Sequence, residues 1–338
     1  MATLKTIAKE AGVSVMTVSN VINGNYSKVS PTTIERVTAI IESSGYRPNM
    51  NARSLVGRSS RIIGIIIPYI SKERESFFRN PYYSNMIGEI EKILREKNYF
   101  LMIRSISTFE EAEIIFKNWN VNGAIFLGIL KKDVSFVQQR VNVPTVLIDS
   151  SEVEGNHIVH VNVDDYRGGY LATSYLLQNG HYKIAFISPS IESDGIVRKR
   201  FEGYVAALKE YGIELDLDLL LTVEVGYEDG VYLAEKVKEL GVSAVFTTAD
   251  IVAIGIIEGL KRIGMKIPTD ISIIGFDNLE VGEFITPKLT TIDQSIIQKA
   301  HLSVESLLNY IENKNVSYKK DLIIDPSLII RESVVKKI

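Results

Sequence analysis

Residues 3–23 read TLKTIAKEAGVSVMTVSNVIN. Apolar residues recur at helical spacing in two short segments: Ile7, Ala8 and Ala11 in the first, and Val18, Val21 and Ile22 in the second. Between them, Gly12 can adopt the left-handed backbone of a tight turn, and Ser14 can cap the second helix. This pattern is typical of a helix-turn-helix DNA-binding unit, although a helical hairpin that only packs against another element has the same pattern.

A third helix is predicted after this pair. Ser30 can be its N-cap, Pro31 its first helical residue, and Gly45 lies where the helix should stop. Its apolar stripe consists of Ile34, Val37, Ile40 and Ile41. The three helices can therefore share one small core.

The charge of the chain is unevenly distributed. Residues 1–61 hold eight Lys or Arg against three Glu, a formal +5, so residues 62–338 must hold −8 for the chain to total −3. A basic head on an acidic body is expected when only the head meets phosphate. The charge pattern thus favours DNA binding by the head.

Composition bounds the rest of the chain. At 338 residues with 46% hydrophobic content, the chain has room for two ordinary domains after a head of roughly 60 residues. No apolar run approaches the ~18 residues of a membrane span and no signal peptide is evident, so we expect a cytoplasmic protein with no membrane partner. The absence of cysteine excludes disulfides, thiol nucleophiles and cysteine-ligated zinc. No metal-ligand spacing relates the four histidines, which are His157, His160, His181 and His301.

Strands and helices alternate after residue 61. Strands are predicted at 62–68, 100–104, 123–127, 144–148, 184–188, 219–222, 244–247 and 271–276. Helices are predicted at 84–97, 109–117, 166–178, 199–211, 230–240 and 251–263. This order predicts an α/β fold with two doubly wound lobes of parallel sheet.

Such sheets bind ligands at the carboxyl ends of their strands, so two facing lobes should form a cleft. The residues just past predicted strand ends are Tyr69, Gly128, Asp149, Asp250 and Asp277. Asp149 and Asp250 could instead be simple caps of the helices that follow. Arg200 could be a solvated surface base or a clamp for a polar ligand. These residues form no catalytic constellation.

From Thr3 to Ser333 the chain resembles the lactose repressor and galactose repressor (LacI/GalR) family of bacterial transcription regulators. The motifs that carry the resemblance are 7–14, 17–19, 45–49, 52–55, 80–83, 180–181, 200–203, Asp250 with Ala253 and Gly255, 268–278, 289–291, and Arg331 with Ser333. The resemblance implies a helix-turn-helix head at 1–46, a hinge-helix linker at 47–61 and an effector-binding core at 62–338. The core of this family is similar to periplasmic binding proteins, and its lobes are not contiguous. The first lobe would comprise about 62–162 and 292–322, and the second about 163–290 and 323–338.

The resemblance also implies a homodimer on a roughly palindromic, double-stranded operator. By position, Val15, Met16 and Asn20 would face base edges, and Thr17, Ser19 and Lys28 would touch phosphate. The full set of DNA-contacting residues implied is Lys5, Ser14, Val15, Met16, Thr17, Ser19, Asn20, Asn23, Lys28, Asn49, Ala52, Arg53 and Leu55. Many relatives have Arg where this chain has Asn20, and Asn suits adenine whereas Arg suits guanine. We therefore expect an operator half-site that differs from the common one.

The linker would form a helix over the minor groove when DNA is bound. Leu55 occupies the position of the family's leucine wedge, which enters between base steps and bends the duplex. Ala52 would lie beside it and Arg53 near the phosphates or the groove floor. Without the surrounding motif, Leu55 would read equally well as an ordinary linker residue.

In the core, the resemblance implies an effector cleft. Its lining residues would be Tyr82, Tyr83, Gly128, Asp149, Arg200, Asp250 and Gln294. The tyrosine rings would stack on the ligand, and the charged groups would take its polar atoms. Two departures stand out: Val225 replaces the aromatic platform that several relatives have, with Tyr227 nearby, and residues 72–78 lengthen the loop before Asn80.

The function expected is allosteric repression by a dimer under the control of a small effector, a sugar or sugar derivative, with no cofactor and no metal. A purine or a partner protein acting as corepressor is the alternative, and a sugar-binding transport protein is a weaker one. A transport protein would leave the head and the hinge unexplained. An enzyme would need a nucleophile or a carboxylate pair that the sequence does not provide.

Overall fold

The computed structural model describes residues 2–22, 24–46, 60–69, 77–150, 158–191, 195–312 and 321–337, without the side chain of residue 117. It comprises two compact units, Met1–Ser60 and Arg61–Ile338. Each unit has a hydrophobic core of its own.

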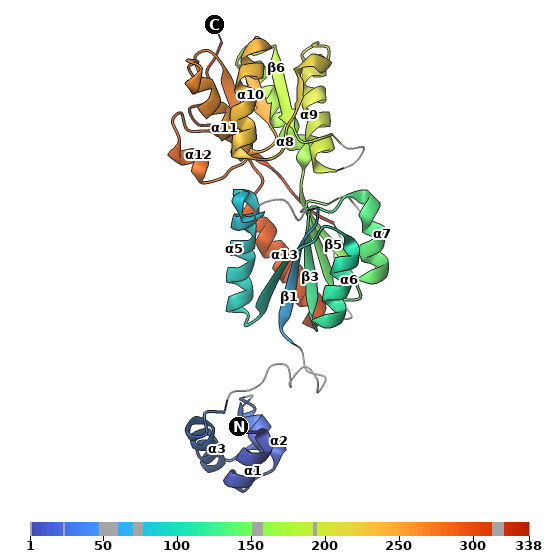
Figure 1. Ribbon diagram of the computed structural model, residues 1–338, viewed down its shortest axis with the longest axis vertical. Coiled ribbons are helices and arrows are strands. Elements are labelled where there is room, and N and C mark those ends of the chain that lie inside the picture. Colours follow the sequence, from blue (N-terminus) through green and yellow to red (C-terminus); the bar gives the residue numbers. More distant parts are fainter. Residues whose placement is uncertain are drawn as a thin grey trace. The chain divides into compact units, whose positions relative to one another are not determined.

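The first unit is all-α (Figure 1). Its elements are α1 (Leu4–Ala11), α2 (Val15–Ile22), the 3-10 turn η1 (Tyr26–Lys28) and α3 (Pro31–Ser43). Gly12 ends α1 at φ 62°, in the left-handed region. The hydroxyls of Ser14 and Ser30 accept hydrogen bonds from the backbone N–H of Thr17 and Thr33, which caps the two following helices. The buried core of this unit consists of Ile7, Ala8, Ala11, Val18, Val21 and Val37.

The second unit contains two six-stranded sheets. The first sheet is all parallel in the order β11-β5-β4-β3-β1-β2. Its strands are β1 (Ile62–Ile67), β2 (Phe100–Ser105), β3 (Gly123–Leu127), β4 (Thr145–Ile148), β5 (Ile158–Val163) and β11 (Asp321–Ile324). The second sheet has the order β12-β10-β9-β8-β6-β7 and is parallel except for the antiparallel edge strand β12. Its strands are β6 (Ile184–Ser188), β7 (Leu220–Thr222), β8 (Ala244–Thr247), β9 (Ser272–Asp277), β10 (Thr290–Asp293) and β12 (Ser327–Ile329).

Helices cover both faces of each sheet (Figure 1). On the first sheet, Ile65 and Ile67 of β1 face α5 (Pro81–Glu96) and α13 (Ile296–Glu312), whereas Ile66 faces α6 (Phe109–Asn118) and α7 (Lys131–Arg140). On the second sheet, α10 (Tyr227–Glu239) and α11 (Asp250–Arg262) cover one face, and α8 (Asp165–Gln178) and α9 (Ile196–Glu210) the other. The short elements are η2 (Phe77–Arg79), η3 (Leu217–Leu219) and α12 (Val281–Phe284). Because both faces of the sheets are covered, inner strands such as β1, β3 and β8 are almost entirely apolar rather than alternating.

The chain passes between the two sheets three times. It leaves the first sheet after β5, returns after β10 to form α13 against α5, and leaves again between β11 and β12. The predicted fold class, a helical head on two lobes of doubly wound sheet, is confirmed. Within the described part of the chain, none of the helices combines the length and apolarity required for a membrane span.

Candidate functional site

The first candidate site is the outer face of α2. Val18 and Val21 are buried, whereas Met16 and Val15 are 67% and 41% exposed. Exposed apolar side chains of this size on a two-turn helix are available to contact another molecule. The structure therefore presents Val15 and Met16 on the side of α2 opposite the core.

The polar residues of the predicted DNA face have distinct surroundings. Lys5 and Lys28 are exposed, and Thr17, Ser19 and Asn20 are half-buried. Ser14 caps α2, and its hydroxyl lies 2.9 Å from that of Thr17. Five predicted DNA-contacting residues lie outside the described part of the chain: Asn23, Asn49, Ala52, Arg53 and Leu55.

The second candidate site is a cavity of about 160 Å³ in the second unit. Its lining comes from both sheets: Asn80, Tyr82, Tyr83, Leu127, Gly128, Asp149, Pro189, Ile196, Val197, Arg200, Val225, Thr248, Ala249, Asp277 and Gln294. Most of these residues follow the carboxyl ends of parallel strands, where such folds bind ligands. The volume holds on the order of ten water-sized groups, the bulk of a monosaccharide. Six of the seven residues expected in the cleft line this cavity, and Asp250 does not.

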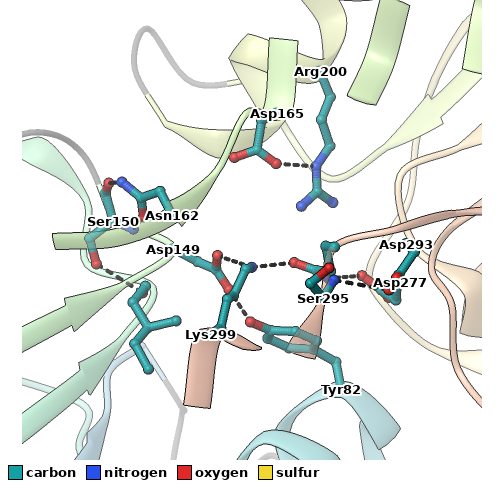
Figure 2. Close-up of polar contacts among 12 residues, drawn as sticks. Tyr82, Asp149, Ser150, Asn162, Asp165, Arg200, Asp277, Asp293, Ser295 and Lys299 are labelled. Carbon is teal, nitrogen blue, oxygen red and sulfur yellow. Dashed lines mark hydrogen bonds and ion pairs between the residues drawn. The ribbon is translucent and has the colours of Figure 1, made fainter. Parts of the chain in front are cut away.

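Arg200 of α9 is the buried cation of the second lobe. Its Nε donates to Oδ1 of Asp165 at 2.8 Å, one terminal nitrogen donates to the carbonyl of Thr248 at 2.7 Å, and its guanidinium lies 3.6 Å from the ring centroid of Phe276. Burial raises the pKa of Asp165, and the positive charge of Arg200 opposes that shift. Figure 2 shows Asp165 beside the guanidinium, bonded to Nε, with the two terminal nitrogens of Arg200 directed away from Asp165 and downward. Arg200 is thus a preorganised donor at the cavity wall.

Asp149 follows β4 and is the buried anion of the first lobe. One carboxylate oxygen accepts a hydrogen bond from the hydroxyl of Tyr82, and the other lies 2.5 Å from Nζ of Lys299 (Figure 2). Lys299 also donates to the side-chain carbonyl of Gln294, whose amide nitrogen donates to Asp277. Burial and the negative charge of Asp250 raise the pKa of Asp277 well above its ordinary value.

The tyrosine pair is placed by the start of α5. The side-chain oxygen of Asn80 accepts a hydrogen bond from the backbone N–H of Tyr82 at 3.0 Å, and Pro81 is the first helical residue. The rings of Tyr82 and Tyr83 lie 5.7 Å apart and both line the cavity. Burial raises the pKa of Tyr82 well above 10 and that of Tyr83 to about 12, so both hydroxyls remain protonated donors. Val225 lines the cavity from the second lobe. The family resemblance had predicted Val225 at the position where several relatives have an aromatic residue.

Asp250 does not line the cavity, and its side chain instead hydrogen-bonds to neighbouring elements of the second lobe. Its side chain is fully buried and accepts hydrogen bonds from the hydroxyl of Thr291 at 2.6 Å and the backbone N–H of Leu279 at 2.8 Å. These bonds connect the start of α11 to the segment that follows β9 and to the second residue of β10. Burial raises the pKa of Asp250 from 3.8 to about 6.

This shift predicts a pH dependence of stability. Between pH 4 and pH 6 the folded state binds more protons at Asp250 than the unfolded state, so the contribution of this group to stability falls as pH rises, by at most about 3 kcal/mol. Asp250→Asn should remove that part of the dependence, whereas Asp218→Asn, at an exposed position, should leave it unchanged. Melting temperatures of the three proteins across this pH range check the prediction. Parallel curves for the parent chain and Asp250→Asn would contradict it.

Three residues of the network of hydrogen bonds around the cavity, Asp165, Asp277 and Lys299, were not among the expected effector residues. Asp277 was noted as a strand-end residue, but Lys299 was not noted at all. The buried positions of α13 are Ile296, Lys299, Ala300, Ser303, Val304, Leu307 and Leu308. A lysine within a helical stripe of this kind is the signal that could have identified it.

A helix-turn-helix unit followed by a two-lobed core, with a cavity that combines apolar and charged lining residues, defines an effector-binding transcription regulator. Residues 3–49 match the family described as bacterial regulatory proteins, lacI family, and residues 173–334 match the periplasmic binding protein-like domain. The chain is 30% identical to the ribose operon repressor of Haemophilus influenzae and 30% identical to the transcriptional repressor PurR of Vibrio vulnificus, with 99% of each chain covered in both cases. A solved complex of the regulator CelR with cellobiose is 26% identical, with a TM-score of 0.71 over 98% of this chain and 100% of that one.

The chain belongs to the lacI family of bacterial regulatory proteins. It is a DNA-binding repressor with an effector-binding core, and not an enzyme.

Proposed function

We propose that the chain binds a palindromic operator as a homodimer and that its effector is a neutral sugar. The observation that carries the sugar assignment is the charge balance of the cavity network. Among the described residues, the network joins three carboxylates, Asp149, Asp165 and Asp277, to two cations, Arg200 and Lys299. With all five groups ionised, the network is negative by one charge, and protonation of one of its carboxylates makes it neutral.

This balance disfavours anionic effectors such as sugar phosphates, because the like charge of the carboxylates opposes their entry. The hydroxyls of a neutral sugar can donate to Asp149 and Asp277 and accept from the terminal nitrogens of Arg200. A purine has few N–H donors for two carboxylates, and among the described lining residues the aromatic rings are those of Tyr82 and Tyr83, on one side of the cavity. The PurR relative keeps a purine as the second candidate.

A thermal-shift screen of the full chain tests the assignment. The compounds are ribose, glucose and cellobiose, then ribose 5-phosphate and glucose 6-phosphate, then hypoxanthine and guanine. A ligand of the folded state at 100 times its Kd should stabilise the protein by about 2.7 kcal/mol, and we expect this only among the neutral sugars. Stabilisation by the phosphates or the purines alone would overturn the sugar assignment and leave the regulator assignment intact.

Asn20 provides a prediction for the operator. If Asn20 reads an adenine, Asn20→Ala should lose about 1–3 kcal/mol of discrimination at one base pair of each half-site. Lys28→Ala is the matched control, because loss of a phosphate contact weakens binding to all sequences alike and reduces its salt dependence. Selection of sites from a random DNA pool by the parent and both variants checks this. An unchanged half-site preference in Asn20→Ala would exclude base reading by Asn20.

A further inference from the structure

Lys299 is a fully buried lysine in the first turn of α13. Its neighbours on the buried face of that helix include Ile296, Ala300 and Val304. Burial of an ammonium group is costly unless it is paired and hydrogen-bonded. Its position therefore depends on the groups that surround Nζ.

Three side chains surround that nitrogen, and all three line the cavity. Nζ lies 2.5 Å from Oδ1 of Asp149, donates to the side-chain carbonyl of Gln294, and lies 5.6 Å from the ring centroid of Tyr82. Lys299 itself does not line the cavity. Lys299 is therefore a buried cation outside the cavity lining that orients residues of the lining, and Figure 2 shows its contact with Asp149.

The orientation of Gln294 extends this network to the second lobe. Because its carbonyl oxygen accepts from Lys299, its amide nitrogen faces and donates to Asp277, the last residue of β9. Asp149 follows β4 of the first sheet, and Gln294 lies in the crossing between β10 and α13. The ammonium group of Lys299 therefore connects Asp149, at the end of β4 in the first lobe, through Gln294 to Asp277, at the end of β9 in the second lobe.

The backbone around the network is held in uncommon conformations. Asp149, Asp277 and Ser295 have φ values of 52°, 129° and 53°, which non-glycine residues rarely adopt. Such residues persist only where surrounding interactions determine them. The side chains of Lys299 and Gln294 hydrogen-bond to Asp149 and Asp277, and the backbone N–H of Lys299 donates to the carbonyl of Ser295, which lies where the chain returns to the first lobe.

We propose that Lys299 is a positioning residue that fixes Asp149 and Gln294 and thereby sets the relative arrangement of the two lobes around the cavity. This inference rests on the proposed effector role of the cavity. An effector that hydrogen-bonds to Asp149, Gln294 or Asp277 competes for the same groups, so its affinity differs between lobe arrangements. Lys299 would then determine how strongly a bound effector changes the relative arrangement of the two lobes.

The test measures the distance between the lobes in the absence of effector and DNA. Since the chain has no cysteine, Lys97→Cys on the first lobe and Lys236→Cys on the second provide two unique sites for spin labels at exposed positions. Full-length labelled protein is diluted into unlabelled protein, so that each measured pair lies within one chain. Pulsed electron paramagnetic resonance then gives the distance distribution.

Lys299→Met should shift or broaden the distribution by more than about 2 Å, the scale of loop and domain rearrangements. Lys288→Met is the matched control, with the same change of charge at an exposed position. It should leave the distribution as in the parent chain. A distribution that Lys299→Met leaves unchanged would overturn the proposal, whatever happens to the melting temperature.

A charge-balanced variant separates positioning from stability. Lys299→Met with Asp149→Asn leaves no unpaired carboxylate, so its melting temperature should recover toward that of the parent chain. Gln294 still lacks its donor in this variant, so the altered distance distribution should remain. If the distribution recovers together with the melting temperature, Lys299 is structural only and the proposal fails. Because no effector is used, this outcome is independent of the sugar assignment.

Discussion

Arg200→Met is expected to destabilise the second unit by about 3–5 kcal/mol, the cost of leaving a buried carboxylate without its partner. Asp165 and Arg200 have side chains only 2% and 5% exposed, so water cannot replace the missing guanidinium. The variant also loses the donor to the carbonyl of Thr248. We therefore expect both lower stability and loss of any sugar-induced thermal shift.

The pH dependence of this deficit has a definite sign. Burial raises the pKa of Asp165, and removal of Arg200 raises it further, because the cation opposes that shift. The carboxylic acid form costs less to bury than the carboxylate, so the deficit should shrink as the pH falls. Urea unfolding of the parent and the variant at two pH values measures this change.

Two further variants make the prediction specific. Arg198→Met, two residues before on the same helix, removes a half-exposed pair with Glu202 at 3.0 Å and should cost less than about 1 kcal/mol. Arg200→Met with Asp165→Asn should regain most of the lost stability without regaining the sugar response, because the unpaired charge is gone but the donor is still missing. A cost for Arg200→Met no larger than that for Arg198→Met would show that the buried pair contributes little.

Local signals in the sequence were sufficient for the helical head and for most of the strands. Gly12, Ser14 and Ser30 act within a few residues of their own position, so their turn and capping roles are readable from neighbouring letters. Strands β5, β10, β11 and β12 were not predicted, and β5 shows why. Its sequence IVHVNV alternates apolar and polar residues, yet all six are buried. Asn162 is accommodated there by two hydrogen bonds with the backbone of Ser150, a partner that local sequence cannot supply.

Some residues around the cavity could likewise be predicted from the neighbouring sequence, whereas others depend on residues far away in the chain. Strand ends indicated Asp149 and Asp277, because parallel strands bring their carboxyl ends to one edge. The same rule was misleading for Asp250, whose side chain turns to Thr291 and Leu279 instead of the cavity. Lys299 depends on Asp149, which lies 150 residues earlier in the chain. Its role follows only from the packing of α13 against the first sheet.

Gly203→Ala is the second change with a large expected effect. A Cβ at this position of α9 would lie 2.0 Å from the carbonyl oxygen of Tyr166 in α8. Gly169 of α8 is in the reciprocal position, with its Cβ 2.0 Å from the carbonyl oxygen of Arg200. The two helix backbones are therefore in direct contact, and this contact brings Arg200 within reach of Asp165.

Two opposing effects decide the result of Gly203→Ala. Alanine is favoured over glycine in a helix by about 1 kcal/mol, whereas a clash with backbone can be relieved only by separating the helices. Overpacking typically costs 1–3 kcal/mol, and contact with rigid backbone puts Gly203→Ala at the upper end of that range, so after the gain in propensity we expect a net loss of about 2 kcal/mol. Gly88→Ala is the matched control: Gly88 lies in α5, and an added Cβ would meet no atom within 4 Å, so propensity alone should stabilise the protein. Urea unfolding should give opposite signs for the two variants, and stabilisation by both would show that α8 and α9 can separate without cost.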